Sequence, residues 1–493
     1  MIKVWDVAVV GGGAAGCVLA SRLSETAGRS VLLLEAGPDL RAPMPDDVRD
    51  GRRPTFDHDW GYLSEQISGG SVLSLFRGKL LGGCSSTNAT FALRGHPADY
   101  DGWTAAGNTG WSFADVLPYF SKLETDEDFG WAPWHGSSGP LPIRRYGDGE
   151  LTDVAWAGLE TLQECGFPRI PDANEPGAVG LARIPVNTRA GERISTALAY
   201  LALSAGRPNL TVRCDAQVAE LILSGARAVG VRLLSGEEIR AQEVVLSAGT
   251  YASPALLMRS GIGPSAALRA LGIPVAANIP GVGQNLIDHP AVSIDLLYDG
   301  PVEPVAVFQV CATFHSSRTD SGGAPDLQCL VSGPYQGDPS KFFLGTALLK
   351  PRSRGNLTLH SIDPTAPPRV DLGYYCEPDD LDRMVEGLQR VRELGHVGAL
   401  KELSGGVEFG PGPEVDLRSW VRKQTWTYHH PVGTCGMGVD PPAGAVVDSE
   451  CRVHGVTGLR VIDASIMPDI PSANTHVPTV MIAERATALI DCL

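Results

Sequence analysis

The feature that most constrains this chain is the glycine-rich segment Gly-Gly-Gly-Ala-Ala-Gly at residues 11–16. Val4–Val10, before it, is a short Val-rich run typical of a buried strand, and Ala14–Ser24 has apolar residues at the spacing of a helix. A second expected strand, Ser30–Leu34, ends at the acidic residue Glu35. The order of strand, GxGxxG turn, helix, strand and acid predicts a βαβ unit that binds a dinucleotide.

Each position of this pattern has a physical role. Gly11 forms the tight turn, Gly13 lets the backbone approach a pyrophosphate, and Gly16 lets the helix pack close to the strand. The first turn of the helix offers unpaired N–H groups and a partial positive charge to the phosphates. Glu35 would accept hydrogen bonds from a ribose. The pattern by itself does not separate FAD from NAD.

The chain is expected to leave this nucleotide domain and to return to it. Asn209–Arg213, Gly230–Leu234 and Val244–Leu246 read as strands, and Ile239–Ser247, followed by a turn of small residues, suggests a return to the first sheet. Residues 302–423 contain short alternating runs together with a helical segment, Asp379–Glu393, which predicts a separate antiparallel sheet with helices. The expected fold class is α/β (α+β overall), with a Rossmann-like nucleotide-binding domain and a second, antiparallel-sheet substrate domain.

Composition and charge narrow the class of molecule that the protein can bind. The formal net charge of −16 and the absence of Lys or Arg runs argue against nucleic acid and favour a small molecule. The ten cysteines, from Cys17 to Cys492, form no CxxC pair, which favours reduced thiols and a cytoplasmic location. The first apolar run lacks the features of a signal peptide. No stretch approaches the about 20 apolar residues of a membrane-spanning helix, so no membrane span is expected.

Five further segments, spread over nearly the whole chain, resemble signatures of the glucose-methanol-choline oxidoreductase family. In family order they are 77–103, which starts Arg-Gly-Lys-Leu-Leu-Gly-Gly-Cys-Ser-Ser-Thr-Asn; 249–264, which starts Gly-Thr-Tyr-Ala-Ser-Pro; Gly-Val-Gly-Gln-Asn-Leu-Ile-Asp-His at 281–289; Pro-Arg-Ser-Arg-Gly at 351–355; and Val-Ile-Asp-Ala-Ser at 461–465.

The resemblance implies an FAD-binding domain built from discontinuous segments and a substrate domain that covers the flavin. The corresponding division is 1–150, 193–300 and 426–493 for the FAD-binding domain, with 151–192 and 301–425 forming the substrate domain. The resemblance also implies that Gly82, Gly83 and Asn88 line the isoalloxazine, that Val218 meets the adenine and that Asp463 meets the ribityl chain. The full set of cofactor residues implied is Gly11, Gly13, Ala14, Ala15, Gly16, Glu35, Ala36, Arg77, Leu81, Gly82, Gly83, Ser85, Asn88, Ala89, Val218, Ala248, Gly249, Asp463, Ala464, His476 and Val477.

The segment Tyr-His-His-Pro-Val-Gly-Thr-Cys at 428–435 resembles the active-site segment of the family, which assigns the catalytic base to His430. An imidazole with an unperturbed pKa of about 6.5 can accept the proton of an alcohol hydroxyl at neutral pH. The expected reaction is oxidation of an alcohol to its carbonyl, with hydride transfer to flavin N5. His429 is expected to be structural or to line the substrate pocket.

A second catalytic residue is expected in Asn-Thr-His-Val-Pro at 474–478, where the family carries a His or an Asn that faces the base. We assign this role to His476, which would hydrogen-bond the hydroxyl or the emerging alkoxide. Pro478 is expected to open the final helix, whose N-terminus would stabilise negative charge on the reduced flavin.

The FAD is expected to be bound without a covalent link. Some members of the family attach the flavin through a His that lies two residues after Cys-Ser, whereas here Thr87 follows Cys84-Ser85-Ser86. His96, a little downstream, is expected on a solvent-side loop. No metal site is expected because the histidines form no cluster with ligand spacing, and His135 is interpreted as structural.

The substrate is not determined by the sequence. Trp426, Phe308, Phe342 and Phe343 are candidate wall residues, which favours a primary, aromatic or heteroaromatic alcohol. The electron acceptor, oxygen or another molecule, stays open, and with it the choice between oxidase and dehydrogenase. Three alternatives also stay open: an FAD-containing hydroxynitrile lyase of the same fold, a nicotinamide-dependent dehydrogenase and an FAD-carrying scaffold.

Overall fold

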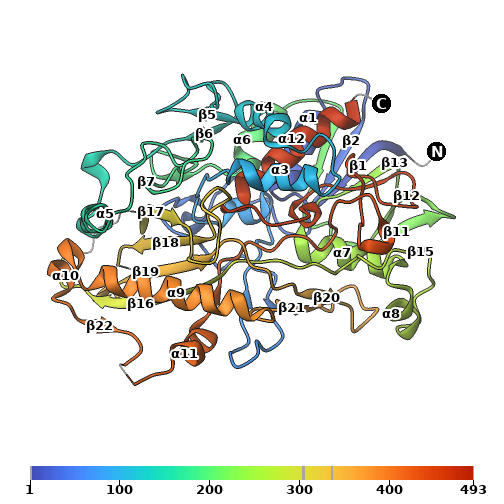
Figure 1. Ribbon diagram of the computed structural model, residues 1–493. Coiled ribbons are helices and arrows are strands. Elements are labelled where there is room, and N and C mark those ends of the chain that lie inside the picture. Colours follow the sequence, from blue (N-terminus) through green and yellow to red (C-terminus); the bar gives the residue numbers. More distant parts are fainter. Residues whose placement is uncertain (1–2, 302–305, 335–336, 413, 492–493) are drawn as a thin grey trace.

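The structure is a computed structural model that describes residues 3–301, 306–334, 337–412 and 414–491 (Figure 1). Cys492 and residues 302–305, at the start of the expected antiparallel region, lie outside the described residues. Two seven-stranded sheets organise the molecule.

The first sheet is built around the glycine-rich segment. Its main path runs β10-β2-β1-β13-β12-β11, and β24 pairs with β13 beside that path. Strands β10, β2, β1, β13 and β24 are mutually parallel, and β12 and β11 form an antiparallel extension. The bounds are β1 Val4–Val10, β2 Val31–Leu34, β10 Leu210–Arg213, β11 Val218–Ser224, β12 Arg227–Leu233, β13 Glu238–Leu246 and β24 Leu459–Val461. The predicted βαβ unit is confirmed, since β1 and β2 pair in parallel on either side of α1.

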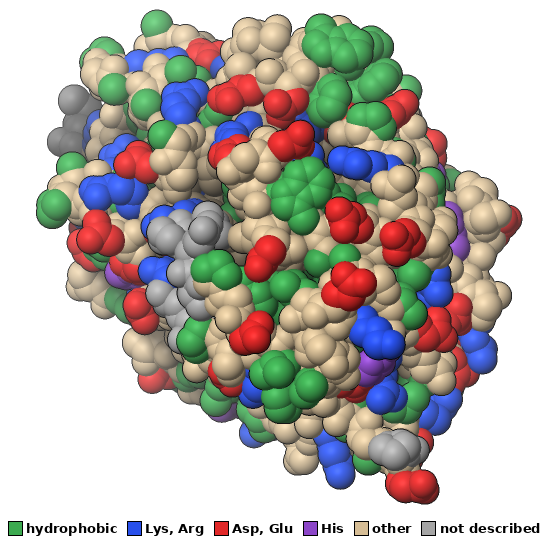
Figure 2. Space-filling view, turned by 90° about the vertical axis from the view of Figure 1, so that its left-hand side faces the viewer, with side chains coloured by type: hydrophobic (Ala, Val, Ile, Leu, Met, Phe, Trp, Pro, Cys, Tyr) green, Lys and Arg blue, Asp and Glu red, His purple; other side chains and the backbone are tan. Residues whose placement is uncertain are grey.

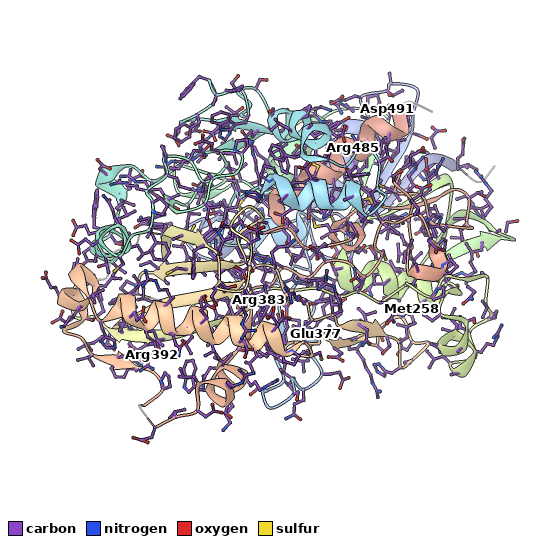
Figure 3. The ribbon with its side chains drawn as sticks, viewed as in Figure 1. Met258, Glu377, Arg383, Arg392, Arg485 and Asp491 are labelled. Atoms are coloured by element: carbon purple, nitrogen blue, oxygen red, sulfur yellow. The ribbon has the colours of Figure 1, made fainter. Side chains whose placement is uncertain are left out.

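Four helices pack together beside this sheet: α1 Ala14–Leu23, α4 Phe113–Leu123, α6 Thr196–Leu203 and α12 His476–Asp491. They share the fully buried carboxylate of Glu484 on α12. This carboxylate accepts from Arg22 at 2.7 Å and from the Tyr200 hydroxyl at 2.8 Å, and it pairs with Lys122 at 2.9 Å. A buried carboxylate is tolerated only when it is paired and hydrogen-bonded. Glu484 therefore ties all four helices to one point. Arg485 and Asp491, labelled in Figure 3, lie on the same helix.

The second sheet is antiparallel throughout, as expected from the alternating runs. Its order is β22-β16-β19-β18-β17-β7, with β23 paired to β16. The bounds are β7 Leu181–Arg183, β16 Pro290–Leu297, β17 Phe308–Phe314, β18 Leu327–Ser332, β19 Lys341–Leu348, β22 Glu408–Phe409 and β23 Trp426–Thr427. Helix α9, Pro378–Gly395, runs along this sheet and contacts β16, β18 and β19 (Figure 1). Arg383, labelled in Figure 3, bonds Asp326 at 3.1 Å and Asp380 at 2.6 Å.

Two strands belong to the second sheet although the expected domain division places them in the FAD-binding domain. Strand β16 lies before residue 300 and β23 lies after residue 425, yet both pair within the second sheet. The reason is that β16 and β23 pair with each other at one side of this sheet, so the chain re-enters the sheet at β16 and leaves it at β23, within or beside segments that resemble the family signatures.

The remaining elements are short or connect the two sheets. They are α2 Asp46–Arg49, β3 Tyr62–Leu63, β4 Ser74–Leu75, α3 Pro97–Ala105, β5 Glu124–Asp126, β6 Leu141–Ile143, α5 Asp153–Glu164, β8 Thr188–Arg189, β9 Glu192–Arg193, α7 Gly249–Arg259, β14 Ile262–Gly263, α8 Ser265–Ala270, β15 Ala277–Asn278, β20 Asn356–Thr358, β21 Arg369–Asp371, α10 Gly398–Ser404 and α11 Leu417–Gln424, with 3₁₀ turns at Gly83–Ser86, Asp148–Glu150, Pro441–Ala443 and Ala464–Ile466.

On the face shown in Figure 2, Lys and Arg side chains are interspersed with Asp and Glu side chains. Within the described part of the chain, no helix has both the length and the apolar character needed to cross a membrane.

Candidate active site

A single large cavity, about 700 Å³ in volume, extends from the glycine-rich turn to the second sheet. One end is formed by the ends of β1, β2 and β13 and by the start of α1, where Gly11, Glu35 and Ala248 lie. The other end is formed by side chains of β16, β17, β19 and β23. The cavity therefore joins the expected nucleotide site to the expected substrate domain.

The glycine-rich turn has the geometry that a dinucleotide site needs. Gly11 has a φ of +100°, and a Cβ there would lie 2.4 Å from the carbonyl oxygen of Ser247 on the neighbouring strand connection. A Cβ on Gly16 would lie 1.8 Å from the Gly11 oxygen, so only glycine lets α1 pack this closely. A Cβ on Gly13 would meet no atom within 4 Å, and this residue lines the cavity. Gly13 thus keeps the space in front of the α1 N-terminus clear.

Glu35 stands at the end of β2, buried but in the cavity wall. Its oxygens accept from the N–H of Gly12 at 2.8 Å and of Gly37 at 2.7 Å. Burial raises the pKa of Glu35 to about 7, against the lowering effect of these hydrogen bonds. The carboxylate thus stabilises the glycine-rich turn by hydrogen bonds and also faces the cavity.

Most residues assigned to the cofactor by resemblance line this cavity: Gly11, Gly13, Ala14, Ala15, Glu35, Ala36, Arg77, Gly83, Ser85, Asn88, Ala89, Val218, Ala248, Gly249, Asp463, Ala464 and His476. Their contacts with a cofactor stay a prediction. Four assigned residues, Gly16, Leu81, Gly82 and Val477, do not line it. They lie behind the wall because they are packing residues: a Cβ on Gly82, for example, would lie 2.0 Å from Ser86 Oγ.

The carboxylate of Asp463 holds the first turn of α7 at the cavity wall. One oxygen accepts from Gly249 N at 2.8 Å and from Ser253 Oγ at 2.6 Å, and the other accepts from Ser465 N at 2.8 Å. Asp463 therefore joins the segment after β24 to the helix after β13, whose strands are paired in the sheet.

His430 lies at the far end of the cavity and is buried, with 7% of its surface exposed. Its Nε2 lies 3.1 Å from Asn474 Nδ2, and its Nδ1 lies 3.0 Å from His289 Nδ1. Its backbone N–H donates to Asp288 Oδ1 at 2.8 Å. Burial lowers the pKa of His430 well below its usual value, and His289, His429 and Arg77 act in the same direction. The imidazole is therefore neutral at pH 7 and can accept a proton.

The partner of His430 in the 474–478 segment is Asn474. The catalytic role that the sequence assigns to His476, a hydrogen bond to the substrate hydroxyl, stays a prediction. Among the described residues, no hydrogen bond joins His476 to His430. His476 is the first residue of α12, lines the cavity, and has no hydrogen-bond partner at Nε2. The spacing of the segment does not reveal the contact of Asn474, because Asn474 lies two residues before α12 and His476 opens it.

His429 turns away from His430, as expected for adjacent residues. It has a φ of +64°, and its carbonyl oxygen accepts from Arg77 at 2.9 Å. Its ring contacts Phe76 and Phe56 at centroid distances of 5.6 and 6.3 Å. It lines the cavity on the side of these phenylalanines, and its role stays a prediction.

Five aromatic side chains form a connected surface, here called the aromatic wall, that ends at His430. Successive ring centroids lie 5.4, 5.8, 6.5 and 5.8 Å apart, and the last ring lies 4.4 Å from that of His430. The wall consists of Phe91, Phe308, Phe343, Trp426 and Tyr428. Sequence reasoning found three of them but missed Phe91 and Tyr428.

The assignment of Phe342 to this wall is wrong. Phe342 is fully buried on the opposite face of β19, where its ring lies 6.3 Å from that of Tyr298. Neighbouring residues of a strand point to opposite faces, so only one of Phe342 and Phe343 can face the cavity.

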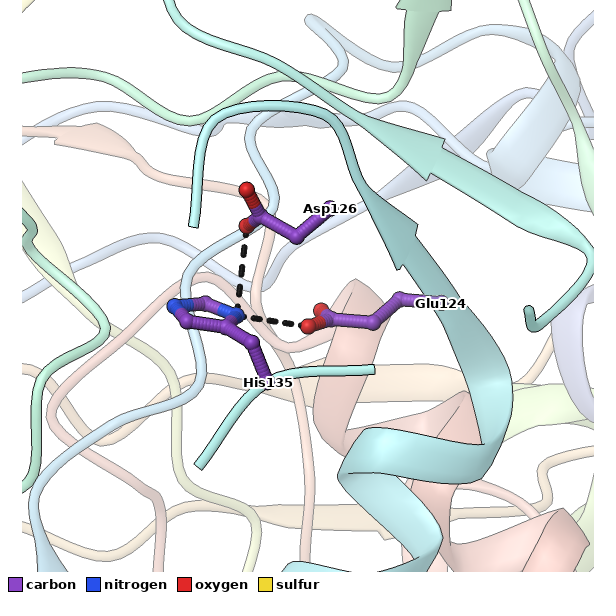
Figure 4. A group of neighbouring side chains, drawn as sticks. All are labelled: Glu124, Asp126 and His135. Atoms are coloured by element: carbon purple, nitrogen blue, oxygen red, sulfur yellow. Dashed lines mark hydrogen bonds and ion pairs between the residues drawn. The ribbon is translucent and has the colours of Figure 1, made fainter. Parts of the chain in front are cut away.

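Outside the cavity, a compact buried ion network surrounds His135 (Figure 4). Its Nδ1 lies 2.6 Å from Glu124 and 3.2 Å from Asp126, and its Nε2 lies 2.8 Å from Asp172. Burial acts to lower the pKa of His135, but the hydrogen bonds to Asp172 and Glu124 outweigh it and raise the pKa.

Two arginines complete the network. Arg145 pairs with Asp126 at 2.5 Å and Asp172 at 2.7 Å, while Arg94 pairs with Glu124. With His135 protonated, three cations face three carboxylates, so the group is electrically balanced without an ion. A metal would need the lone pairs that these hydrogen bonds already occupy. A buried network of this composition is typical of a structural role, which is also the role that the sequence analysis gives to His135.

Several observations fit FAD in the large cavity. Its nucleotide end has an open helix N-terminus at Gly13 and an acid at the end of β2. Four polar atoms in the wall, Tyr251 Oη, His429 Nδ1, Asn474 Oδ1 and His476 Nε2, are buried without a hydrogen-bond partner in the structure. Buried polar atoms are usually paired, so unpaired polar atoms on residues that line a cavity fit a polar ligand bound there.

Comparison with known proteins agrees with this geometry. Two sequence models described as GMC oxidoreductase match residues 5–291 and 351–483. The chain is 37% identical to a 5-(hydroxymethyl)furfural oxidase from Methylovorus sp., over 98% of both chains. It is 37% identical to an oxygen-dependent choline dehydrogenase from Paraburkholderia xenovorans, over 98% of this chain and 93% of that protein. A solved structure, pyridoxine 4-oxidase from Mesorbium loti, superposes with a TM-score of 0.92 at 31% identity and 99% coverage of both chains.

Proposed function

The chain belongs to the GMC oxidoreductase family of FAD-dependent enzymes, and we propose that it oxidises a primary alcohol carried on a flat, uncharged ring. The single observation that carries the proposal is the pairing of His430 Nε2 with Asn474 Nδ2, 3.1 Å apart, at the end of an aromatic wall.

His430 and Asn474 have different roles toward the hydroxyl group of the substrate. The neutral His430 accepts the hydroxyl proton at Nε2, and Asn474 donates its amide N–H to the hydroxyl oxygen as negative charge develops there. Asn474 Nδ2 and His430 Nε2 bond each other in the structure. A substrate hydroxyl that replaces this bond donates to Nε2 and accepts from Nδ2, which gives the carbon that carries it a fixed direction. Bound FAD supplies the hydride acceptor for this carbon.

Asp288 holds this arrangement in place. It is fully buried, accepts from the backbone N–H of His430, and also accepts from Tyr374 Oη at 2.8 Å and Thr427 Oγ1 at 2.5 Å. These contacts fix the main chain on which the base is carried.

The aromatic wall supports the substrate class. The second-sheet residues that line the cavity, Ser293, Phe308, Phe343, Trp426 and Tyr428, carry no charge. Aromatic side chains stack well on a flat ring. They also attract a quaternary ammonium by cation–π interaction, so choline is the informative competitor. We expect kcat/KM for furanic, pyridine and benzylic primary alcohols to exceed that for choline. A preference for choline would contradict the substrate class while leaving alcohol oxidation intact.

The test of the reaction is anaerobic addition of these alcohols to the yellow holoenzyme. Bleaching of the flavin spectrum shows net oxidation of the alcohol. A protein that cleaves a cyanohydrin without bleaching would be a lyase, and one that does neither would be a scaffold.

The His430→Ala variant should retain its flavin and lose the bleaching rate by about 10² to 10⁴, the contribution of a positioned base. The matched control is His360→Ala, at an exposed position away from the cavity. Normal single-turnover reduction in His430→Ala would contradict the assignment.

The electron acceptor and the compartment are further parts of the proposal. We propose oxygen as the acceptor on the strength of the oxidases and the oxygen-dependent dehydrogenase among the relatives. Peroxide measured beside the reduction of an artificial dye tests it. A cytoplasmic location is proposed from the scattered cysteines, and cell fractionation tests it.

A further inference from the structure

A second histidine lies directly behind the catalytic base. We propose that His289 is a positioning residue that fixes the ring proton of His430 on Nδ1, so that Nε2 carries the lone pair that takes the proton of the substrate. The proposal rests on the proposed function for the identity of the base. His289 acts only through His430 and does not contact the substrate.

The geometry of the two rings leaves one arrangement of protons. The two Nδ1 atoms lie 3.0 Å apart, and the ring planes are nearly perpendicular at 88°. Two N–H groups in these positions would repel, and two lone pairs would leave both buried atoms unpaired. One ring must therefore donate and the other accept.

The orientation of the Asn474 amide alone does not set the tautomer of His430. Its nitrogen, which donates, faces Nε2 and uses the lone pair of Nε2 in the Nδ1–H tautomer. A rotated amide would present its oxygen and would suit the Nε2–H tautomer equally well. The acceptor that His289 offers at its own Nδ1 selects the Nδ1–H tautomer of His430, and the proton of His289 is then on Nε2.

The backbone of both histidines is fixed by one atom. Asp288 Oδ1 accepts from the N–H of His289 at 2.9 Å and from the N–H of His430 at 2.8 Å. The main chain that carries the two rings is therefore held at one point, and the ring–ring hydrogen bond fixes the orientation of the imidazoles on it.

His289 acts as a neutral acceptor. It is fully buried, and burial together with the nearby cation of Lys350 lowers its pKa to about 3, against the opposing effects of the Leu349 and Pro471 backbones and of Asp469. A carboxylate at this place would draw the proton and raise the pKa of His430. A neutral imidazole orients the base and leaves its pKa low.

The proton transfer balances with this assignment. The O–H bond of the alcohol breaks, an N–H bond forms at His430 Nε2, and the Nδ1–H bond remains intact and keeps donating to His289. No proton has to move through His289. The other charged or titratable groups near His430 in the described part of the chain include Arg77, His429, Asp288 and Tyr428, and His289→Asn or His289→Phe leaves all four in place.

The experiment compares two substitutions in the holoenzyme. In His289→Asn, the amide oxygen can stand near the place of Nδ1 and accept from His430. In His289→Phe, the ring volume is kept and the acceptor is lost. We expect the rate of flavin reduction to fall by about 10- to 100-fold in His289→Phe, the usual effect of losing a group that orients an active-site imidazole. We expect His289→Asn to recover most of it.

Histidine ¹⁵N NMR spectra of the same proteins provide a readout independent of activity. The wild type and His289→Asn should show His430 as the Nδ1–H tautomer, and His289→Phe should show a mixture. Flavin content and Tm are measured for each, and His360→Asn is the matched surface control.

Wild-type turnover and an unchanged His430 tautomer in His289→Phe would overturn the proposal. Equal loss in both variants with an unchanged tautomer would also overturn it, because it would show a purely structural role. If the wild type oxidised no alcohol, the proposed function would fail, while the tautomer measurement would still decide the role of His289.

Discussion

At the level of single residues, the environment of His430 changes the expected pH dependence. The sequence alone predicts that the rate falls as an imidazole with a pKa of about 6.5 becomes protonated. The structure buries the ring, and burial lowers its pKa well below that value. A base works only when unprotonated, so a lowered pKa keeps it active to lower pH.

We therefore predict a rate of flavin reduction that is constant from pH 8 to about 6.5 and that declines only below that range. Stopped-flow reduction by substrate, extended to the lowest pH at which the flavin stays bound, measures the acid limb. A midpoint at or above about 6.5 would contradict the burial argument. A flat rate at neutral pH, which the sequence alone would count against a histidine base, is here the expected result.

Two single-residue features of the site could not be predicted from the sequence. His-Pro-Val-Gly-Thr is a distinctive run that indicates His430, whereas Asn-Thr-His-Val-Pro indicates His476 and gives no sign that Asn474 contacts the base. The distinction depends on the turn that precedes α12, which brings the side chain two residues earlier against the base. In the same way, the choice between Phe342 and Phe343 depends on the register of β19.

A comparison of Asn474→Ala with His476→Ala separates the two candidates. We predict that Asn474→Ala lowers kcat by at least about tenfold, because the developing alkoxide loses its donor. His476→Ala should be milder, and His476→Asn milder still, because Asn keeps a hydrogen-bond donor at the cavity wall. Retained flavin in all three variants is the control. The reverse order of effects would restore His476 as the partner of His430.

At the level of elements, the first βαβ unit was predicted almost to the residue. Strand β1 has the expected bounds, and α1 and β2 differ from expectation by one residue each. The pattern is strong because buried parallel strands are continuously apolar and the glycines have no substitute. Helix α12 starts at His476, two residues before the expected start at Pro478, because proline is tolerated within the first turn of a helix.

Two glycine substitutions in this unit should have separable effects. Gly13→Ala adds a methyl group that meets no protein atom within 4 Å but points into the cleared space. We predict normal folding of the apoprotein and FAD binding weakened by about tenfold, or about 1.4 kcal/mol. Gly16→Ala places a Cβ 1.8 Å from the Gly11 oxygen and should lower stability itself, by about 1–3 kcal/mol. Apoprotein Tm and FAD titration measure the two quantities, and equal effects on both in the two variants would contradict the assigned roles.

At the level of the whole molecule, the two sheets enclose the cavity together, and this bears on how FAD is held. A cofactor that spans from β1 to the second sheet is contacted along its length by both halves of the structure. Many such contacts can hold a large ligand tightly without a covalent bond. The sequence could predict the two sheets but not this enclosure, because it depends on β16 and β23 crossing between segments that the motifs assign to the cofactor.

We predict that the FAD is not covalently attached. Thr87 lines the cavity where some members of the family carry the linking histidine, and its hydroxyl forms no stable link of that kind. His96 lies elsewhere: it caps α3, and its Nδ1 accepts from Ala98 N at 3.2 Å. Cys84 also lines the cavity, and its Sγ accepts from Gly78 N at 3.4 Å.

Acid denaturation should release all the yellow colour into the supernatant and leave the unmodified protein mass. Colour in the pellet, or a mass raised by that of FAD, would contradict the prediction, and repeating the measurement on Cys84→Ser and His96→Ala would then identify the linking residue.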